Sequence, residues 1–245
     1  MRAVSEGSLM AGPTESKSRS GRSLIPLFLD LEGKLVVIFG GGKVGERKAR
    51  LFSDYGPVRV VSRDFTDDLW AMREKLELVA SDLTLGFEKY LEEAFIVIPA
   101  TSDSELNRAI EEEATRRGIL VNKVEGTGNV VVPSRIRKGS ITIAISTENP
   151  GLTKYLRLRL EKELTENYQE MARLLSQIRP ELREFIPRQE DRARVIWSIL
   201  EDEEIWRQLG ASYEKAYMRA RLHACQDERD SLDAGDAPQS LHRRD

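Results

Sequence analysis

The sequence contains one cysteine, Cys225, and only two histidines, His223 and His242, among its 245 residues. A single thiol excludes an internal disulfide and a zinc cluster held by several thiolates. Because both histidines stand near the C-terminus, the preceding 222 residues offer neither imidazole nor thiol for chemistry. If the body of the chain transfers a proton, a carboxylate is the natural group to do it.

Long apolar runs are also missing, since the longest are the five-residue runs 35–39 and 94–98. A bilayer-spanning helix needs roughly 20 apolar residues, so no transmembrane segment is predicted. Residues 1–22 lack the apolar core of a secretory signal. We therefore expect a soluble, cytoplasmic protein.

The chain has no excess of positive charge: 38 basic and 41 acidic residues give a net charge of −3. This balance excludes a globally basic nucleic-acid-binding protein. One segment differs, because residues 129–164 contain seven basic and three acidic residues. That local surplus is either ordinary solvated surface charge or a site for an anionic ligand.

The chain between its two ends is rich in regular patterns. Residues 1–22 and 226–245 combine small and polar residues without apolar periodicity, and we expect both tails to be disordered. Apolar runs typical of buried strands occupy residues 35–39, 58–61, 76–79, 95–98 and 119–121, and helical patterns at 44–55 and 104–117 lie between them. Such alternation predicts an α/β fold with a parallel sheet and right-handed crossovers.

A different pattern follows the last of these strands. Residues 129–132 and 140–145 are strand-like, with Pro133 and Gly139 between them. From residue 150 to about 224 the pattern is helical, with breaks expected near Pro180 and Pro187. We assign the aromatic residues of this region to a helical core; they are Trp197, Trp206, Tyr213 and Tyr217.

A glycine-rich loop is the first chemical signal. Residues 40–45 satisfy the pattern G-x-G-x-x-G directly after a predicted strand and at the start of a predicted helix. In this context Gly40 permits the tight turn, Gly42 lets the backbone approach a pyrophosphate, and Gly45 lets the helix pack closely on the strand. Lys43 and Val44 open the helix, whose N-terminal N–H groups favour phosphate. The loop predicts a dinucleotide cofactor, NAD or NADP.

Two further segments belong to the predicted cofactor site. Asp64 follows the second strand about 20 residues after the loop, where a carboxylate accepts a hydrogen bond from the adenosine ribose of NAD. Its neighbour Arg63 would instead favour the 2′-phosphate of NADP, and we prefer NAD. After the fourth strand, Thr101 either hydrogen-bonds the nicotinamide half or helps to cap the next helix with Ser102 or Asp103.

The chain resembles a known family in a series of short segments. The most telling is the triple glycine followed by Arg47 and Lys48 in the first helix. The others are residues 26–31, 100–101, 107, 121–124, 133–134 and 145–147. Together these segments resemble the precorrin-2 dehydrogenase and sirohydrochlorin ferrochelatase family, the small siroheme-synthase proteins.

The resemblance implies an architecture and an activity. It implies a Rossmann-type parallel sheet followed by a small central α/β dimerisation region and a C-terminal helical domain, which we assign to residues 23–128, 129–164 and 165–225. It also implies a homodimeric oxidoreductase of siroheme biosynthesis, a branch of porphyrin biosynthesis, that oxidises the tetrapyrrole precorrin-2 to sirohydrochlorin with NAD. Bifunctional members of the family then insert Fe²⁺ as a lyase.

The family pattern also indicates site residues. Its members carry an aspartate, assigned to proton transfer, just after Asn-Val-Val, and Glu125 occupies that place here. Precorrin-2 carries eight carboxylate arms, so the basic segment supplies candidate substrate ligands: Arg135, Ser146, Thr147 and Lys154. Where the family has Gly-Gly and then Ser-Pro after the last of these strands, the sequence reads Glu148-Asn149-Pro150-Gly151.

Two other functions compete with this interpretation. A regulatory module that senses NAD(H) without catalysis would have the same dinucleotide-binding half. A dehydrogenase of another small substrate is disfavoured by the lack of a catalytic Lys, His or Tyr signature. The family-like segments after residue 129 favour the enzyme.

Overall fold

The computed structural model describes residues 24–124, 126 and 128–223. The chain divides into two compact units, Met1–Val131 and Val132–Asp245. The expected disordered tails, 1–22 and 226–245, lie outside the described residues, as does Glu125.

The first unit is a five-stranded parallel sheet with the order β3-β2-β1-β4-β5. Its strands are β1 (Leu35–Phe39), β2 (Val58–Ser62), β3 (Glu77–Ala80), β4 (Ala94–Pro99) and β5 (Leu120–Val121). Its helices are α1 (Lys43–Phe52), α2 (Asp67–Ala71) and α3 (Ser104–Arg116), with short 3₁₀ turns η1 (Leu83–Leu85) and η2 (Glu88–Leu91). The predicted α/β class and all five predicted strands are confirmed, each within one residue at either end.

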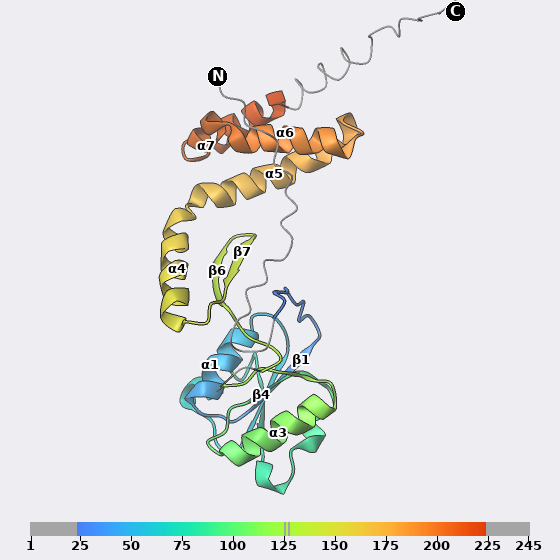
Figure 1. Ribbon diagram of the computed structural model, residues 1–245, viewed down its shortest axis with the longest axis vertical. Coiled ribbons are helices and arrows are strands. Elements are labelled where there is room, and N and C mark those ends of the chain that lie inside the picture. Colours follow the sequence, from blue (N-terminus) through green and yellow to red (C-terminus); the bar gives the residue numbers. More distant parts are fainter. Residues whose placement is uncertain (1–23, 125, 127, 224–245) are drawn as a thin grey trace, which may run out of the picture. The chain divides into compact units, whose positions relative to one another are not determined.

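Buried strands explain why the apolar runs alternate so little in this unit. Residues Val36–Phe39 of β1 are completely buried, because helices cover both faces of a parallel sheet. α1 packs on β1 and β2, whereas α3 packs on β4 and β5 (Figure 1). Right-handed crossovers in opposite directions along the sheet place these two helices on opposite faces. The strand order therefore reverses between β1 and β4.

The second unit begins with an antiparallel hairpin, β6 (Ser134–Lys138) and β7 (Ile141–Ile145). The strand expected at 129–132 is wrong: it is absent from the structure, and the strand lies on the other side of Pro133. Residues 129–130 instead bond to β5, because the Asn129 side chain accepts a hydrogen bond from the Val121 amide and the Val130 amide donates to Val121. The hairpin takes its register from a two-residue turn in which Gly139 has a φ of 56°.

Helices complete the second unit: α4 (Pro150–Glu163), α5 (Glu166–Phe185), α6 (Gln189–Glu201) and α7 (Glu203–Leu209), with residues 213–223 also helical. The break expected near Pro187 is found, but α5 continues through Pro180, so the break predicted there is wrong. A proline inside a helix removes one hydrogen bond and crowds the carbonyl of the preceding turn, at a cost of about 3 kcal/mol that packing must offset. The buried residues Ile178 and Leu182 on either side hold the helix to its neighbours.

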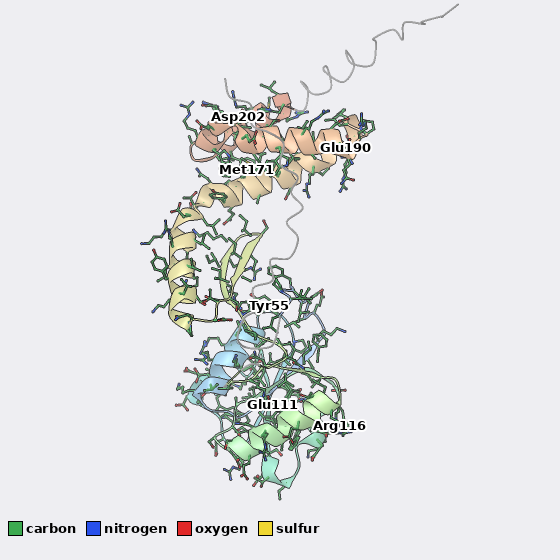
Figure 2. All side chains as sticks on the ribbon, viewed as in Figure 1. Tyr55, Glu111, Arg116, Met171, Glu190 and Asp202 are labelled. Carbon is green, nitrogen blue, oxygen red and sulfur yellow. The ribbon has the colours of Figure 1, made fainter. Side chains whose placement is uncertain are left out.

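The helical core contains Met171, Leu174, Ile199 and Ile205, and Met171 is marked in Figure 2. Partly buried Trp206, Tyr213 and Tyr217 pack against it, as predicted. The assignment of Trp197 to this core is wrong, since Trp197 is 63% exposed. The reason is helical phase: Val195 and Ile199 are buried, and a residue midway between them points to the opposite side of α6.

None of the described helices combines the length and the apolar composition that crossing a bilayer requires.

Candidate functional site: the dinucleotide cleft

The glycine loop lies where the strand order of the sheet reverses. Gly40 continues β1, its amide donates to the Val61 carbonyl at 2.9 Å, and its φ of 116° belongs to glycine. A methyl group on Gly40 would stand 2.3 Å from the carbonyl oxygen of Ala100, the residue that follows β4. Only glycine therefore allows the loop to pass between β1 and β4. In open α/β sheets this switch point is the ligand-binding crevice.

The next two motif glycines differ in what surrounds them. A Cβ on Gly45 would stand 1.9 Å from the Gly40 carbonyl oxygen, so Gly45 lets α1 begin directly against the loop. A Cβ on Gly42 would meet nothing within 4 Å. Gly42 is also the N-cap of α1, and no side chain caps the N–H groups of the first turn. The loop thus presents open space and N–H groups that no described side chain caps, and both fit a pyrophosphate.

A cavity of about 650 Å³ lies over this loop. It is bordered by the ends of β1, β2 and β4 and by η1. Seven predicted cofactor residues line it together: Gly40, Gly42, Lys43, Val44, Arg63, Asp64 and Thr101. The eighth, Gly45, is buried beside the loop. Arg63 and Asp64 are both exposed. The residue that favours NADP and the residue that favours NAD are thus both accessible at the adenosine end of the cavity.

A buried carboxylate that no sequence motif indicates, Glu46, stabilises the loop through hydrogen bonds. Glu46 is 9% exposed, and its Oε2 accepts hydrogen bonds from Lys43 Nζ at 3.0 Å and Thr66 Oγ1 at 2.9 Å. The bond from Lys43 is the main reason that the pKa of Glu46 is lowered, followed by the bond from Thr66. The same bond, with help from Asp68, raises the pKa of Lys43, so the ammonium stays charged at the cavity.

A second cavity of about 430 Å³ adjoins the first and shares Val44, Ala100, Thr101 and Ser102 with it. The two alternatives for Thr101 can now be compared. Asp103 caps α3 by accepting from the amides of Glu105 and Leu106, whereas the Thr101 hydroxyl donates to Asn107 Oδ1 at 2.8 Å. Thr101 is therefore held in the cavity wall next to the cap, and its contact with nicotinamide stays a prediction.

The side of the second cavity near β5 carries charged groups. Lys123, which follows β5, forms an ion pair with Glu111 of α3, the helix on which Figure 2 marks Glu111. Both residues line the cavity together with Arg108 and Val124. The predicted proton-transfer residue, Glu125, comes next in the sequence and lies outside the described residues.

Lys48 is one of the two cations in the first helix that the family pattern singled out. It is half-buried, and its Nζ donates to Asn122 Oδ1 at 2.6 Å. Asn122 is 4% exposed and donates from Nδ2 to the Val130 carbonyl at 3.0 Å. Burial, and secondarily the charge of Arg47, lowers the pKa of Lys48. Lys48 thus ties α1 to Asn122, and Asn122 in turn binds Val130 at the other end of the segment 122–130. Arg47 is exposed.

The predicted substrate residues belong to the second unit. Arg135 is partly buried on β6 opposite Ala144 of β7, Ser146 and Thr147 follow β7, and Lys154 is exposed on α4. The Thr147 hydroxyl pairs with that of Thr153 at 2.6 Å and thus packs against the start of α4. Their part in substrate binding stays a prediction.

The departure from the family pattern at 148–151 has a structural explanation. Asn149 caps α4, and its Oδ1 accepts from the amides of Gly151 and Leu152 at 2.8 and 3.1 Å. Pro150 takes the first helical position, where its missing N–H costs nothing. Asparagine and serine are both good N-caps, so Asn149-Pro150 starts the helix as Ser-Pro would.

Among the described residues, no group of three or more His, Cys, Asp or Glu side chains is arranged to hold a metal ion.

Comparisons with known proteins place this geometry in a family. Residues 27–134 match a family model described as "Putative NAD(P)-binding". A curated precorrin-2 dehydrogenase from Methanosarcina barkeri is 41% identical over 206 residues, which cover 81% of this chain and 92% of that protein. The siroheme synthase of Zymomonas mobilis is 33% identical over 178 residues, but the match covers 71% of this chain and only 37% of that longer protein.

One solved structure supports the fold along most of the chain. SirC, a precorrin-2 dehydrogenase, superposes with a TM-score of 0.63 at 22% identity, covering 84% of this chain and 100% of SirC. At this identity the likeness concerns the fold alone. The sequence match across both units with the Methanosarcina protein decides the assignment, and the chain belongs to the precorrin-2 dehydrogenase and siroheme synthase family.

Proposed function

We propose that the protein oxidises precorrin-2 to sirohydrochlorin with NAD⁺. The observation that supports this proposal most directly is the cleft at the β1–β4 switch point, where Gly42 leaves open space before the uncapped first turn of α1. The relative named precorrin-2 dehydrogenase is matched over 92% of its own length and 81% of this chain. The match therefore includes the cleft and most of the second unit. The overall reaction removes one hydride and one proton from precorrin-2 and yields NADH.

The first unit would hold the dinucleotide. The amides at the start of α1 face the phosphates, and Lys43, oriented by Glu46, adds positive charge. Asp64 would accept a hydrogen bond from the adenosine ribose, and Thr101, which lines both cavities, would contact the nicotinamide half. The cofactor supplies the hydride acceptor, and the chain orients it.

The remaining steps belong to other groups of this chain. Removal of the substrate proton needs a carboxylate, since neither histidine nor cysteine occurs before residue 223. We assign it to Glu125, which occupies the place of the aspartate in the family pattern. Lys48 and Asn122 support that assignment because they fix both ends of the segment that contains Glu125. Arg135 and Lys154 are proposed to pair with substrate carboxylates, and Ser146 and Thr147 to donate hydrogen bonds.

The test is direct. Purified protein incubated with precorrin-2 and NAD⁺ should form NADH and sirohydrochlorin in equal amounts, with a higher kcat/KM for NAD⁺ than for NADP⁺. Binding of NADH without turnover of precorrin-2 by either cofactor would favour a sensing module instead. Addition of Fe²⁺ to supplied sirohydrochlorin, compared with the uncatalysed rate, measures whether the chain also inserts iron as a lyase.

We also propose that the protein is a cytoplasmic homodimer formed through residues 129–164. α4 has no buried residue, although Leu152, Tyr155 and Leu158 expose 49, 57 and 43% of their surface. An apolar helix face of this kind is typical of an interface between copies. Light scattering should give twice the chain mass, and Tyr155→Glu with Leu158→Glu should halve it. A monomeric mass for the unaltered chain would contradict the dimer.

A further inference from the structure

A groove between α5 and α6 in the helical unit has no part in the function proposed so far. These helices lie side by side (Figure 1), and the cavity between them has a volume of about 480 Å³. α5 supplies Arg179, Leu182 and Arg183 to its wall. α6 supplies the remaining wall: Gln189, Arg192, Ala193, Ile196 and Trp197.

The charged residues in the wall of the groove are all basic. All charged residues in its wall are arginines, although residues 165–225 as a whole contain ten basic and eleven acidic residues. Positive charge has thus been separated from negative charge at this place. Such a concentration attracts anions, and a guanidinium group binds a carboxylate through two parallel hydrogen bonds.

The three arginines differ in their hydrogen-bond partners. Arg192 donates from Nη1 to the carbonyl oxygens of Ile186 and Pro187 at 2.7 and 2.6 Å, so it holds the turn after α5. Arg179 and Arg183 are exposed one helical turn apart, and within the described part of the chain neither has a hydrogen-bond or ion-pair partner. Two guanidinium groups are therefore available to a ligand.

Trp197 stands at the same groove and is 63% exposed. It is the largest side chain in the wall, and its phase on α6 turns it away from the helical core. An exposed tryptophan beside arginines is the composition of a recognition site, because the ring stacks on planar ligands while the guanidinium groups bind their anionic substituents. The aromatic component makes a planar organic anion a better ligand than phosphate.

We propose that this groove binds one edge of a planar ring that carries several carboxylates, the chemical class of the substrate and product of the proposed reaction. This identification of the ligand rests on the proposed function. Arg179 and Arg183 bind the carboxylate arms, Trp197 stacks on the ring, and the groove holds the macrocycle on the helical unit independently of NAD. The protein therefore has a second tetrapyrrole site besides the one at which oxidation occurs.

Calorimetric titration of the full chain with uroporphyrin, a stable octacarboxylate ring, tests this site. The double substitution Arg179→Gln and Arg183→Gln should weaken groove binding at least tenfold and remove one site per chain. The charge-matched control is Arg207→Gln with Lys215→Gln, which alters two exposed cations of the same unit outside the groove and should change neither number. Trp197→Ala should weaken binding several-fold, and Trp197→Phe should restore most of it.

The outcomes separate this proposal from the proposed function. Unchanged stoichiometry and affinity in the Arg179→Gln and Arg183→Gln variant, with unaltered helical circular dichroism, would overturn the groove site even if precorrin-2 is oxidised. Loss of one site in that variant, in a protein that does not oxidise precorrin-2, would support the groove and reject the dehydrogenase. An equal loss in the charge-matched control would show non-specific attraction and would also overturn the proposal.

Discussion

Replacing Gly45 by alanine is expected to lower the thermal midpoint of the first unit by at least about 12 °C and to abolish dinucleotide binding. The added methyl group would stand 1.9 Å from the Gly40 carbonyl oxygen, which is a backbone atom, and the position of a Cβ is itself fixed by the backbone of α1. Neither can rotate away, so α1 must shift from β1. Strain of this kind in a buried position costs about 3 kcal/mol or more.

Gly42→Ala is the matched control, because its methyl group would meet nothing within 4 Å. Its thermal midpoint should stay within about 2 °C of the original protein. The dissociation constant for NADH should nevertheless rise at least tenfold, since the methyl group fills the space that the pyrophosphate needs. Thermal melts and NADH fluorescence titrations of the two variants measure both effects. Equal stability of the Gly45→Ala variant and the original protein would contradict the packing argument.

The dinucleotide-binding unit could be predicted from the sequence because its apolar runs and its glycine spacing indicate the same fold. Residues 35–39 are uniformly apolar, and a buried parallel strand requires this. The glycine loop follows at once, and its three motif glycines have separate physical reasons in the structure. Nearly all predicted cofactor residues consequently line one cavity.

The errors arose where tertiary contacts outweighed a local pattern. The run 129–132 has a strand-like composition, but Asn129 and Val130 bond to Val121 and so extend the edge of the first sheet as irregular chain. Its residue type favours a core position for Trp197, but Val195 and Ile199 define the buried face of α6, and Trp197 lies on the opposite face.

The candidate site also contains residues that no motif indicates. Glu46 looks like an ordinary charge one turn into a helix, and its role depends on Thr66, which lies 20 residues away. Lys48 is bound by Asn122, 74 residues away. Sequence spacing cannot predict such partners, because the sheet brings the residues together.

The second large effect is expected for Glu125→Gln, which should lower kcat for precorrin-2 oxidation at least a hundredfold, as removal of a general base typically does. Glutamine has the size of glutamate but accepts no proton at neutral pH. The dissociation constant for NADH should change less than twofold, since the residues that line the dinucleotide cavity are unaltered. Stopped-flow measurement of NADH formation separates the chemical step from product release.

Glu125→Asp is the informative companion, because aspartate is the residue that the family pattern has at this place. It keeps the carboxylate and withdraws it by one methylene, and a displacement of about 1 Å can cost about a hundredfold when the rest of a site is adapted to the longer side chain. If Glu125 is the base, the aspartate variant should retain measurable activity whose pH profile still follows a carboxylate, while the glutamine variant loses that dependence. Full activity in the glutamine variant would assign proton transfer elsewhere. Glu111 would then be the carboxylate to examine, because it lines the second cavity in an ion pair with Lys123.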